Sequence, residues 1–244
     1  WFLVVDNGKQ NDVFSSYWFP REDRMSGQTK QAKVLTPNQV ERFIKFLRTE
    51  TSFPERNVVI GLLSFRAGLR SKEIAGLTWS MVTDAEGKLA DEMTLENTAS
   101  KGKRGGRVIP LHPELRDALR SLRALEQERT ETNPERGCLD CYVITLQKSA
   151  STLASRARSV AALMNGKSNE KLGWFRELGW EGVTSHSGRR TFITNAARNV
   201  VAAGGSLRDV QSLSGHSNLQ NVQRYIDVNV EAKRKVVFSL YDKK

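Results

Sequence analysis

Apolar residues recur at helical spacing from residue 36 onward. Thr36, Pro37 and Gln39 have the composition of a capping box, and apolar positions then follow at i, i+3, i+4 and i+7, namely Val40, Phe43, Ile44 and Leu47. A second run, which starts at Pro54, is apolar nearly all round, so we expect a buried helix that stops at Gly68. The pattern predicts that a folded, largely helical domain begins sharply at Thr36.

The pattern changes to short strands and turns over residues 79–111. Asp84–Gly87 has the composition of a turn, and the apolar pieces Met93–Leu95 and Val108–Leu111 are predicted to pair as a hairpin. The tip of this hairpin, Ser100–Arg107, combines glycines with four cations: Lys101, Lys103, Arg104 and Arg107. Such a loop can be simply solvated, but glycines also allow close approach to a phosphate backbone.

Helical spacing also marks the segment before this hairpin and most of the chain after it. Ser71 and Ser185 are predicted N-caps, the first of a short helix and the second of a helix with His186 in its first turn. Asn165–Gly173 is predicted to be a loop. The remaining predicted helices start at Pro113, cover Ser149–Met164 and Leu207–Leu213, start again at Ser217, and end with a piece near Val230–Leu240. The fold class is therefore mainly α with a small antiparallel β-sheet, an α+β fold.

Charge sets this chain apart more than apolar content does. Its 244 residues include 38 Lys and Arg against 27 Asp and Glu, which gives a net charge of +11 and a pI near 9.9. Such an excess favours a polyanionic partner, with nucleic acid first and an anionic membrane second. No apolar run approaches the ~18 residues of a membrane span and no signal peptide is evident, so we expect a soluble cytoplasmic protein without a membrane partner.

The ends of the folded region and the two cysteines limit the other possibilities. Residues 1–34 mix aromatic clusters with polar runs, and we expect an arm or linker there. Residues 35–244 are expected to form one domain that includes a C-terminal tail helix. Cys138 and Cys141 form a Cys-x-x-Cys pair, but the three histidines do not fall at zinc-finger spacing around it. We therefore expect neither a metal site nor a disulfide framework.

Several residues could carry chemistry, although each also has an ordinary structural explanation. Arg70 lies between two predicted helices with Glu73 three residues later, which could be a surface ion pair. His186 and Arg189 are at i and i+3 in the first turn of a helix, where free N–H groups favour binding of a phosphate. A helix cap beside a solvated arginine would give the same sequence pattern. Tyr225 lies beside the apolar stripe of the helix that starts at Ser217 and could be a packing residue.

Together these residues resemble the tyrosine recombinase (phage integrase) family, the enzymes that exchange DNA strands at specific sites. The resemblance spans about Thr36 to Tyr225. Five motifs occur in the family order: Arg70 in Ala-Gly-Leu-Arg-Ser-Lys-Glu-Ile, the hairpin lysine in Ser-Lys-Gly-Lys, His186-Ser187-Gly188-Arg189, Leu213-Ser214-Gly215-His216, and Tyr225 nine residues after that histidine. Each motif alone is weak, whereas five in order are specific.

Three details depart from the family pattern. Gly188 occupies the place of the usual leucine, which weakens the start of its helix, and Arg190 replaces a common histidine. The hairpin loop is one residue longer than usual. Lys101 is therefore the better candidate for the family's lysine, with Lys103 as the runner-up.

The resemblance implies strand cleavage and rejoining through a 3′-phosphotyrosyl intermediate with Tyr225 as the nucleophile. A phosphodiester is already anionic, so charge must be stabilised at its non-bridging oxygens. We expect Arg70 and Arg189 to do this, with His216 as an additional donor. His186 would accept the tyrosine proton as the general base. No metal, nucleotide or other cofactor is expected.

The remaining implied roles concern DNA contact and assembly. Lys101 would protonate the departing 5′ oxygen, and Lys103, Arg104, Arg107 and Arg190 are expected to contact DNA. The implied partner is double-stranded DNA at a specific site. Family members act as a homo-tetramer in the synaptic complex, with a monomer as the expected state without DNA. The C-terminal stripe of Val236, Val237 and Leu240 would dock on a neighbouring protomer or pack in cis.

Two other functions fit part of the pattern. A type IB topoisomerase shares the active-site logic, and it would differ by acting without a defined DNA site. A non-catalytic regulator would explain Leu207–Ile226, which resembles a helix-turn-helix with Gly215 in the turn. Only about 35 residues precede the domain, too few for the N-terminal helical domain of full-length family members. We expect either a separate catalytic domain or a naturally short recombinase.

Overall fold

The structure is a computed structural model that describes residues 32–96, 106–131, 141–146, 152–167, 171–225 and 237–238. The described residues belong to a single compact unit, Ala32–Lys244. Most of the predicted arm, Cys138, the hairpin tip with Lys101, Lys103 and Arg104, and most of the predicted tail helix lie outside the described residues.

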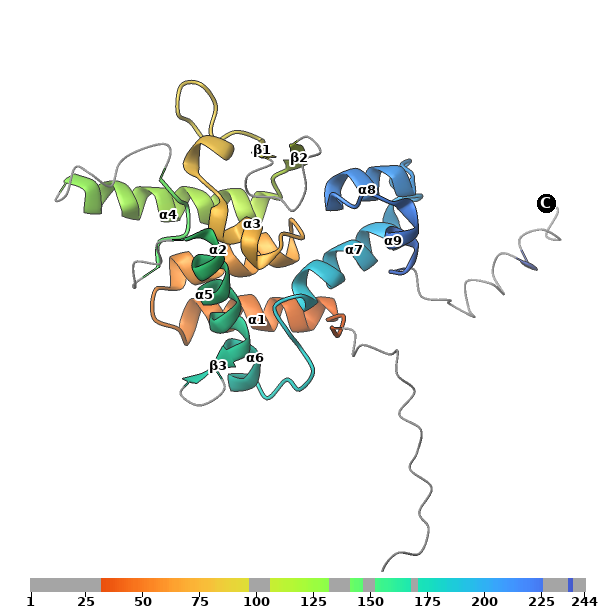
Figure 1. Cartoon of the computed structure of the whole chain (residues 1–244), viewed down its shortest axis with the longest axis horizontal. Helices are drawn as coiled ribbons and strands as arrows, with labels where there is room; N and C mark the ends of the chain where they lie inside the picture. Colours follow the sequence, from red (N-terminus) through yellow and green to blue (C-terminus); the bar gives the residue numbers. More distant parts are fainter. Residues whose placement is uncertain are drawn as a thin grey trace, which may run out of the picture. The chain divides into compact units, whose positions relative to one another are not determined.

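Nine α-helices, one 3₁₀-helix and four short strands occur in the described part of the chain (Figure 1). The helices are α1 (Pro37–Thr49), α2 (Pro54–Phe65), α3 (Ser71–Gly76), α4 (Pro113–Glu131), α5 (Leu153–Asn165), α6 (Trp174–Glu177), α7 (Ser187–Asn199), α8 (Leu207–Ser214) and α9 (Leu219–Gln223), and the 3₁₀-helix η1 is Trp79–Met81. The strands are β1 (Glu92–Leu95), β2 (Arg107–Pro110), β3 (Gly166–Lys167) and β4 (Lys171–Leu172). The prediction of a mainly helical domain with a small antiparallel sheet is confirmed.

The main hydrophobic core is organised around α2, which contacts α1, α4 and α7. Nearly every residue of α2 is buried, as its uniformly apolar sequence predicts. Phe43 on α1 packs against Phe65 at the end of α2 and against Phe175 on α6, with ring centroids 5.5 and 4.8 Å away. On another side, α3 packs against α5. This core fixes the end of α2 and the start of α3. Arg70, the N-cap residue of α3, lies in the connection between them.

The hairpin of β1 and β2 has the predicted antiparallel pairing, with Met93 opposite Ile109. Met93, Leu95 and Ile109 face the core and are buried. A second antiparallel pair, β3 with β4, lies in the segment that we predicted to be a loop over Asn165–Gly173. That prediction was wrong because two-residue strands carry no usable alternation of apolar and polar residues.

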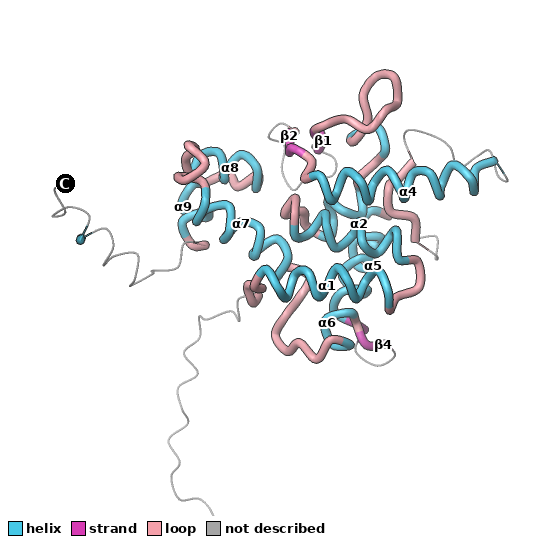
Figure 2. The backbone as a smooth tube through the Cα atoms, turned by 180° about the vertical axis from the view of Figure 1, so that it is seen from behind, coloured by secondary structure: helices cyan, strands magenta, loops and turns pink. Residues whose placement is uncertain are grey.

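A second, smaller core joins α7, α8 and α9. Its buried members are Ile193, Ala197, Val210 and Val222. In Figures 1 and 2, α7 leads from the side of α1 and α2 to α8 and α9. Its N-terminal end contacts α2 through Gly188 and Ser64, and its apolar residues from Phe192 onward belong to the second core. The segment from Leu213 to Tyr225 is therefore held partly on α7 through the second core, while Leu213 packs against the main core and α8 also contacts β2.

The helix caps differ from several predictions. The Thr36–Gln39 capping box of α1 is present as predicted. The N-cap of α3 is Arg70 rather than Ser71, because the Glu73 carboxylate accepts the backbone N–H of Arg70 at 2.7 Å. The N-cap of α7 is His186 rather than Ser185, whose hydroxyl instead accepts a hydrogen bond from Asn165. The last short helix begins at Leu219 after an Asn218 cap, not at Ser217.

No helix in the described ranges has the length and apolar character that crossing a membrane requires. The same ranges contain no group of His, Cys, Asp and Glu side chains that could hold a metal ion.

Candidate active site

The centre of the site is the buried carboxylate of Glu73, which binds the side chains of two arginines. Arg70 donates from Nη1 at 3.0 Å, in addition to its backbone N–H. Arg107 donates from both terminal nitrogens, at 2.9 and 3.0 Å, in a bidentate pair. The Glu73 side chain is only 1% exposed. One carboxylate therefore gathers cations from the start of α3 and from β2.

Arg189 is the third cation of this cluster. Its Nη1 atom lies 3.9 Å from Glu73 Oε2. The same guanidinium donates to the carbonyl oxygen of Gly68 at 2.7 Å and to that of Ser214 at 2.6 Å. Gly68 follows α2 and Ser214 ends α8, so a single side chain ties the main core to the second core. Its side chain is 5% exposed, against 31% for Arg70, which leaves Arg70 the more accessible of the two to a ligand.

The electrostatics of the cluster favour an anion. Burial raises the pKa of Glu73, but the hydrogen bonds and charge of Arg107, the backbone N–H of Arg70 and the charge of Arg189 together lower it below its ordinary value. Burial, and then the neighbouring Arg70, lower the pKa of Arg189 to about 10, so it remains protonated at pH 7. Three guanidinium groups around one carboxylate leave an excess of positive charge. Such a site can stabilise a phosphate or another oxyanion.

His216 and Tyr225 lie beside the three arginines. Burial, followed by the charges of Arg189, Arg70 and Arg107, lowers the pKa of His216 from 6.5 to about 4, so its ring is neutral at pH 7. The centroid of the His216 ring is 5.6 Å from that of Tyr225. Tyr225 is partly buried against the second core, just after α9. The structure thus brings Arg70, Arg189, His216 and Tyr225 into one neighbourhood.

Arg190 and His186 occupy two other positions at the start of α7. The Cζ atom of Arg190 lies 5.8 Å from the centroid of the Tyr225 ring, so Arg190 is a neighbour of Tyr225. His186 is the N-cap residue of α7 and is exposed, with its backbone N–H donating to the Thr184 hydroxyl at 3.3 Å. It therefore begins the helix that carries Arg189, but its ring is not part of the buried ion-pair cluster.

Arg107 has a different setting from the one that we expected. We had placed it in the exposed tip of the hairpin as a DNA contact, whereas it is the first residue of β2 and its side chain is 10% exposed. Its guanidinium also lies against Gly215, where a Cβ atom would be 2.6 Å from Arg107 Nη1. Gly215 has a φ of +63°, a conformation that favours glycine, and a side chain here would also displace the Arg107 guanidinium. Arg107 thus connects the hairpin to the turn before His216.

Two site residues were not identified from the sequence as parts of this arrangement. The inward position of Arg107 had a signal, because Arg107 shares a strand face with the buried Ile109 two residues later. Ser214 had no such signal. Its hydroxyl, which is buried, lies 2.7 Å from His216 Nδ1.

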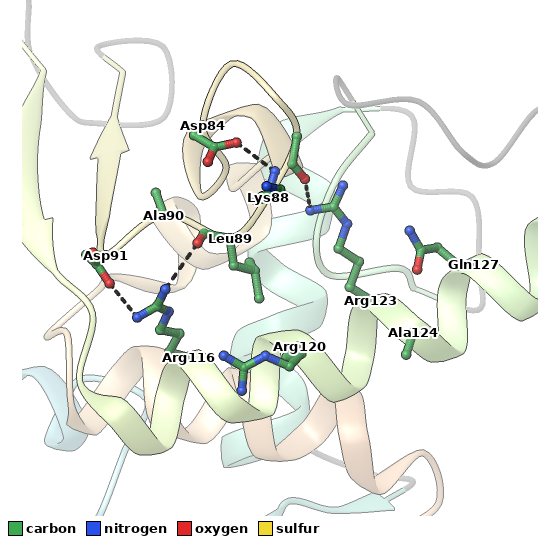
Figure 3. Close-up of a pocket in the computed structure, with 11 residues that line it drawn as sticks. Asp84, Lys88, Leu89, Ala90, Asp91, Arg116, Arg120, Arg123, Ala124 and Gln127 are labelled. Carbon is green, nitrogen blue, oxygen red and sulfur yellow. Dashed lines mark hydrogen bonds and ion pairs between the residues drawn. The ribbon is translucent and has the colours of Figure 1, made fainter.

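A separate hollow of about 810 Å³ lies between α4 and the turn that precedes β1 (Figure 3). Arg123 donates to the carbonyl oxygen of Gly87, while Arg116 pairs with Asp91 and donates to the carbonyl oxygen of Leu89 at 3.4 Å. The hollow shares no residue with the arginine cluster. Arg116 and Arg123 bind the opposite wall, whereas Arg120 pairs with Asp117 on α4 itself. We assign the contacts of Arg116 and Arg123 to the attachment of the turn to α4.

Comparison with known proteins identifies the family of the chain. The family model described as the phage integrase family matches residues 33–232. The tyrosine recombinase XerC of Brucella melitensis biotype 1 is 26% identical over 216 residues, which cover 86% of this chain and 58% of that protein. The tyrosine recombinase XerA of Thermococcus kodakarensis is 28% identical over 203 residues, covering 83% of this chain and 61% of that protein. The chain spans about three fifths of the length of these two relatives.

Solved structures share the fold. The crystal structure of XerA recombinase superposes with a TM-score of 0.59 at 20% identity and covers 88% of this chain and 67% of its own. The Tn1549 transposon integrase, in complex with transposon right end DNA, gives a TM-score of 0.54 at 21% identity, with 92% of this chain and 71% of its own covered. The arrangement of helices around the arginine cluster is therefore that of a known fold.

Proposed function

The chain belongs to the phage integrase family, and from this premise we propose that it is a site-specific DNA recombinase of the tyrosine type. The observation that carries the proposal is the cluster of Arg70, Arg189 and His216 beside Tyr225. Always-charged, fork-shaped arginines fit the non-bridging oxygens of a phosphodiester. A hydroxyl next to that anion site has the chemistry of a nucleophile.

In the proposed reaction, the Tyr225 oxygen attacks the scissile phosphorus and forms a 3′-phosphotyrosyl bond. The bond from phosphorus to the 5′ oxygen breaks at the same centre. His186 accepts the phenol proton, and Lys101 supplies a proton to the departing 5′ oxygen. Arg70 and Arg189 stabilise the charge that develops on the phosphate.

Rejoining is the reverse of this step with a different strand. A 5′-hydroxyl of the partner strand attacks the phosphotyrosyl phosphorus and releases Tyr225. Because one phosphodiester is exchanged for another ester of similar energy, the proposed cycle needs neither a nucleotide nor a metal. The hairpin lysine stays assigned to Lys101 with Lys103 as the alternative, and Arg104 and Arg190 remain proposed DNA contacts.

We assign Arg107 a positioning role instead of a direct contact with DNA. Both of its terminal nitrogens bind Glu73, and its guanidinium packs against Gly215. In this role it would hold the base of the hairpin against the turn that precedes His216. Lys101 and His216 would thereby be kept on the same side of the bound phosphate.

The proposed partner is double-stranded DNA carrying a defined site, in a homo-tetrameric synaptic complex, with residues 35–244 as the catalytic domain and residues 1–34 as an arm. The Tn1549 integrase structure contains transposon right end DNA, and XerH recombinase has been captured on its difH substrate, which supports a DNA partner here. The net charge of +11 supports the same partner.

Covalent capture on DNA tests the proposal. The probe is a library of duplexes with a randomised core and a nick, so that the short fragment released by cleavage diffuses away and rejoining is blocked. We expect a protein–DNA adduct on a denaturing gel, with a restricted set of enriched sequences, and no adduct for Tyr225→Phe. An adduct without any sequence preference would instead indicate topoisomerase-like activity. Binding to DNA without an adduct would indicate a regulator.

A further inference from the structure

The hydroxyl of Ser214 lies where it can determine which ring nitrogen of His216, Nδ1 or Nε2, carries the proton. Ser214 is the last residue of α8 and is 1% exposed. Its Oγ atom is 2.7 Å from His216 Nδ1 and 3.2 Å from the carbonyl oxygen of Gln211. A serine hydroxyl has one proton to donate, so it can give that proton to only one of these two acceptors at a time.

The Gln211 carbonyl is already supplied with donors. It accepts the backbone N–H of His216 at 3.2 Å, and it shares with the Ser212 carbonyl the backbone N–H of Gly215, which caps α8. A carbonyl oxygen has two lone pairs, and these two donors already compete for them with the Ser214 hydroxyl. The Ser214 proton is therefore better placed on His216 Nδ1, which is also the shorter of its two contacts.

The direction of this hydrogen bond decides what the other ring nitrogen can do. Burial, and then the charges of the arginine cluster, lower the pKa of His216 and keep it neutral at pH 7. A neutral imidazole has one N–H and one bare nitrogen. If Nδ1 accepts from Ser214, the proton must be on Nε2, and Nε2 becomes a donor to an anion. If Nδ1 carried the proton, Nε2 would present a lone pair that repels a phosphate oxygen.

We propose that Ser214 is a positioning residue that holds His216 in the Nε2–H tautomer, so that a neutral histidine donates a hydrogen bond to the scissile phosphate. This inference rests on the proposed function for its purpose, but its geometry belongs to the free protein. Ser214 also presents its carbonyl oxygen to Arg189 at 2.6 Å. One residue at the end of α8 thus orients two phosphate-binding groups, the histidine through its side chain and the arginine through its backbone.

Nuclear magnetic resonance of the ring nitrogens tests the tautomer without any DNA. The chain has three histidines, so ¹⁵N-histidine labelling gives three ring systems, which His112→Gln and His186→Gln variants assign. At neutral pH we expect His216 with a protonated Nε2 and a bare Nδ1 that accepts a hydrogen bond. Ser214→Ala should mix the two tautomers, whereas Ser212→Ala, which removes an exposed hydroxyl from the same helix, should leave the spectrum unchanged. A protonated Nδ1 in the wild-type protein would overturn the proposal.

A double-mutant cycle tests whether Ser214 acts through His216. With the enriched nicked duplex, we expect His216→Ala to slow adduct formation by ~10²–10³-fold, as for the loss of one donor to a developing charge. Ser214→Ala should slow it by about tenfold, with DNA affinity unchanged, because the ring would still be an Nε2 donor part of the time. In the His216→Ala background, Ser214→Ala should not slow adduct formation any further. An equal cost in both backgrounds would show that Ser214 acts through general structure and would reject the proposal.

The two experiments separate this inference from the proposed function. If the wild-type protein forms no covalent adduct with any duplex, the proposed function fails while the tautomer of the free protein can still be as stated. If the adduct forms but His216 carries its proton on Nδ1, the recombinase proposal stands and the role of Ser214 does not.

Discussion

At the scale of single residues, one carboxylate and one neutral histidine share a cluster of three arginines. Glu73 compensates part of the positive charge and positions Arg70 and Arg107 by direct hydrogen bonds. Its burial makes these contacts strong, since little water competes for them. The remaining positive charge is available to an anionic ligand, and burial together with this charge lowers the pKa of His216 and keeps its ring neutral.

Replacing Glu73 with Gln should destabilise the protein strongly. The change leaves buried guanidinium groups without a counter-charge, which typically costs about 3–5 kcal/mol. Urea unfolding followed by circular dichroism gives the free energy of unfolding. Glu114→Gln is the matched control, because Glu114 forms a partly exposed pair with Arg66 at 3.1 Å and its loss should cost less than about 1 kcal/mol. Equal losses for both variants would contradict the central role of Glu73.

The depressed pKa of His216 should appear in the pH dependence of stability. The unfolded chain binds a proton on this histidine below its ordinary pKa of 6.5, whereas the folded protein resists protonation down to about pH 4. Stability should therefore fall as pH drops from 6.5 to 4 and should not change from this cause above 6.5. Unfolding curves at several pH values should show this loss reduced in His216→Gln. Glu73, whose pKa is lowered from 4.5, contributes a loss only at the acid end of this window and below it.

At the scale of secondary-structure elements, the close approach of α2 and α7 positions Arg189. A Cβ atom on Gly188 would lie 2.1 Å from Ser64 Oγ, 2.9 Å from Ser64 Cβ and 3.1 Å from the Ser64 carbonyl carbon. The glycine that departs from the family's usual leucine is therefore explained by contact with Ser64. The next residue of α7, Arg189, then reaches the carbonyl oxygen of Gly68 just beyond the end of α2.

Gly188→Ala should consequently destabilise the domain, although alanine favours helices by about 1 kcal/mol over glycine. Crowding against a well-packed neighbour costs about 1–3 kcal/mol, and the Ser64 backbone cannot move aside as a side-chain end can. We expect a net loss of about 1–2 kcal/mol in thermal or urea unfolding. Adding Ser64→Gly should recover part of the crowding cost. A stabilised Gly188→Ala protein would show that the two helices are not in tight contact.

The sequence predicted the long helices well because their apolar positions recur every turn and their ends carry strong signals. The capping box at Thr36 and the uniformly apolar α2 are examples. Short elements were less predictable, because tertiary contacts decide them. The sequence predicts Ser185 as an N-cap, but its hydroxyl accepts a hydrogen bond from Asn165 on α5. His186 is the N-cap residue instead.

The candidate site was predictable in its residue types and not in its internal bonds. Arg70, Arg189, His216 and Tyr225 were identified by motif order, and the structure places them together. The pairing of Arg107 with Glu73 joins residues 34 positions apart, and no local pattern indicates which acid a hairpin arginine will meet. The same applies to Arg189, whose two carbonyl partners are 121 and 25 positions away.

At the scale of the whole molecule, the net charge of +11 should make DNA binding strongly dependent on salt. Each phosphate contact contributes a slope of about −0.9 to the logarithm of the association constant against the logarithm of salt concentration. Lys103→Gln, in the predicted hairpin tip, should make this slope less steep by about 0.9, the contribution of one phosphate contact. Arg120→Gln, in the hollow on α4, should leave it unchanged. Fluorescence anisotropy over a salt series measures both, and an effect of Arg120 equal to that of Lys103 would contradict the assigned binding face.

The central claim is that Tyr225 is the residue that becomes covalently bound to DNA, and mapping the bound peptide tests it most directly. The chain has four tyrosines, Tyr17, Tyr142, Tyr225 and Tyr241. Trypsin cleavage of the purified adduct after Arg224 and Lys233 should release the peptide Tyr225–Lys233, and nuclease treatment should leave a nucleotide remnant on it. Mass spectrometry should locate that remnant on Tyr225 alone. A remnant on any other residue, or an adduct that persists in Tyr225→Phe, would contradict the account.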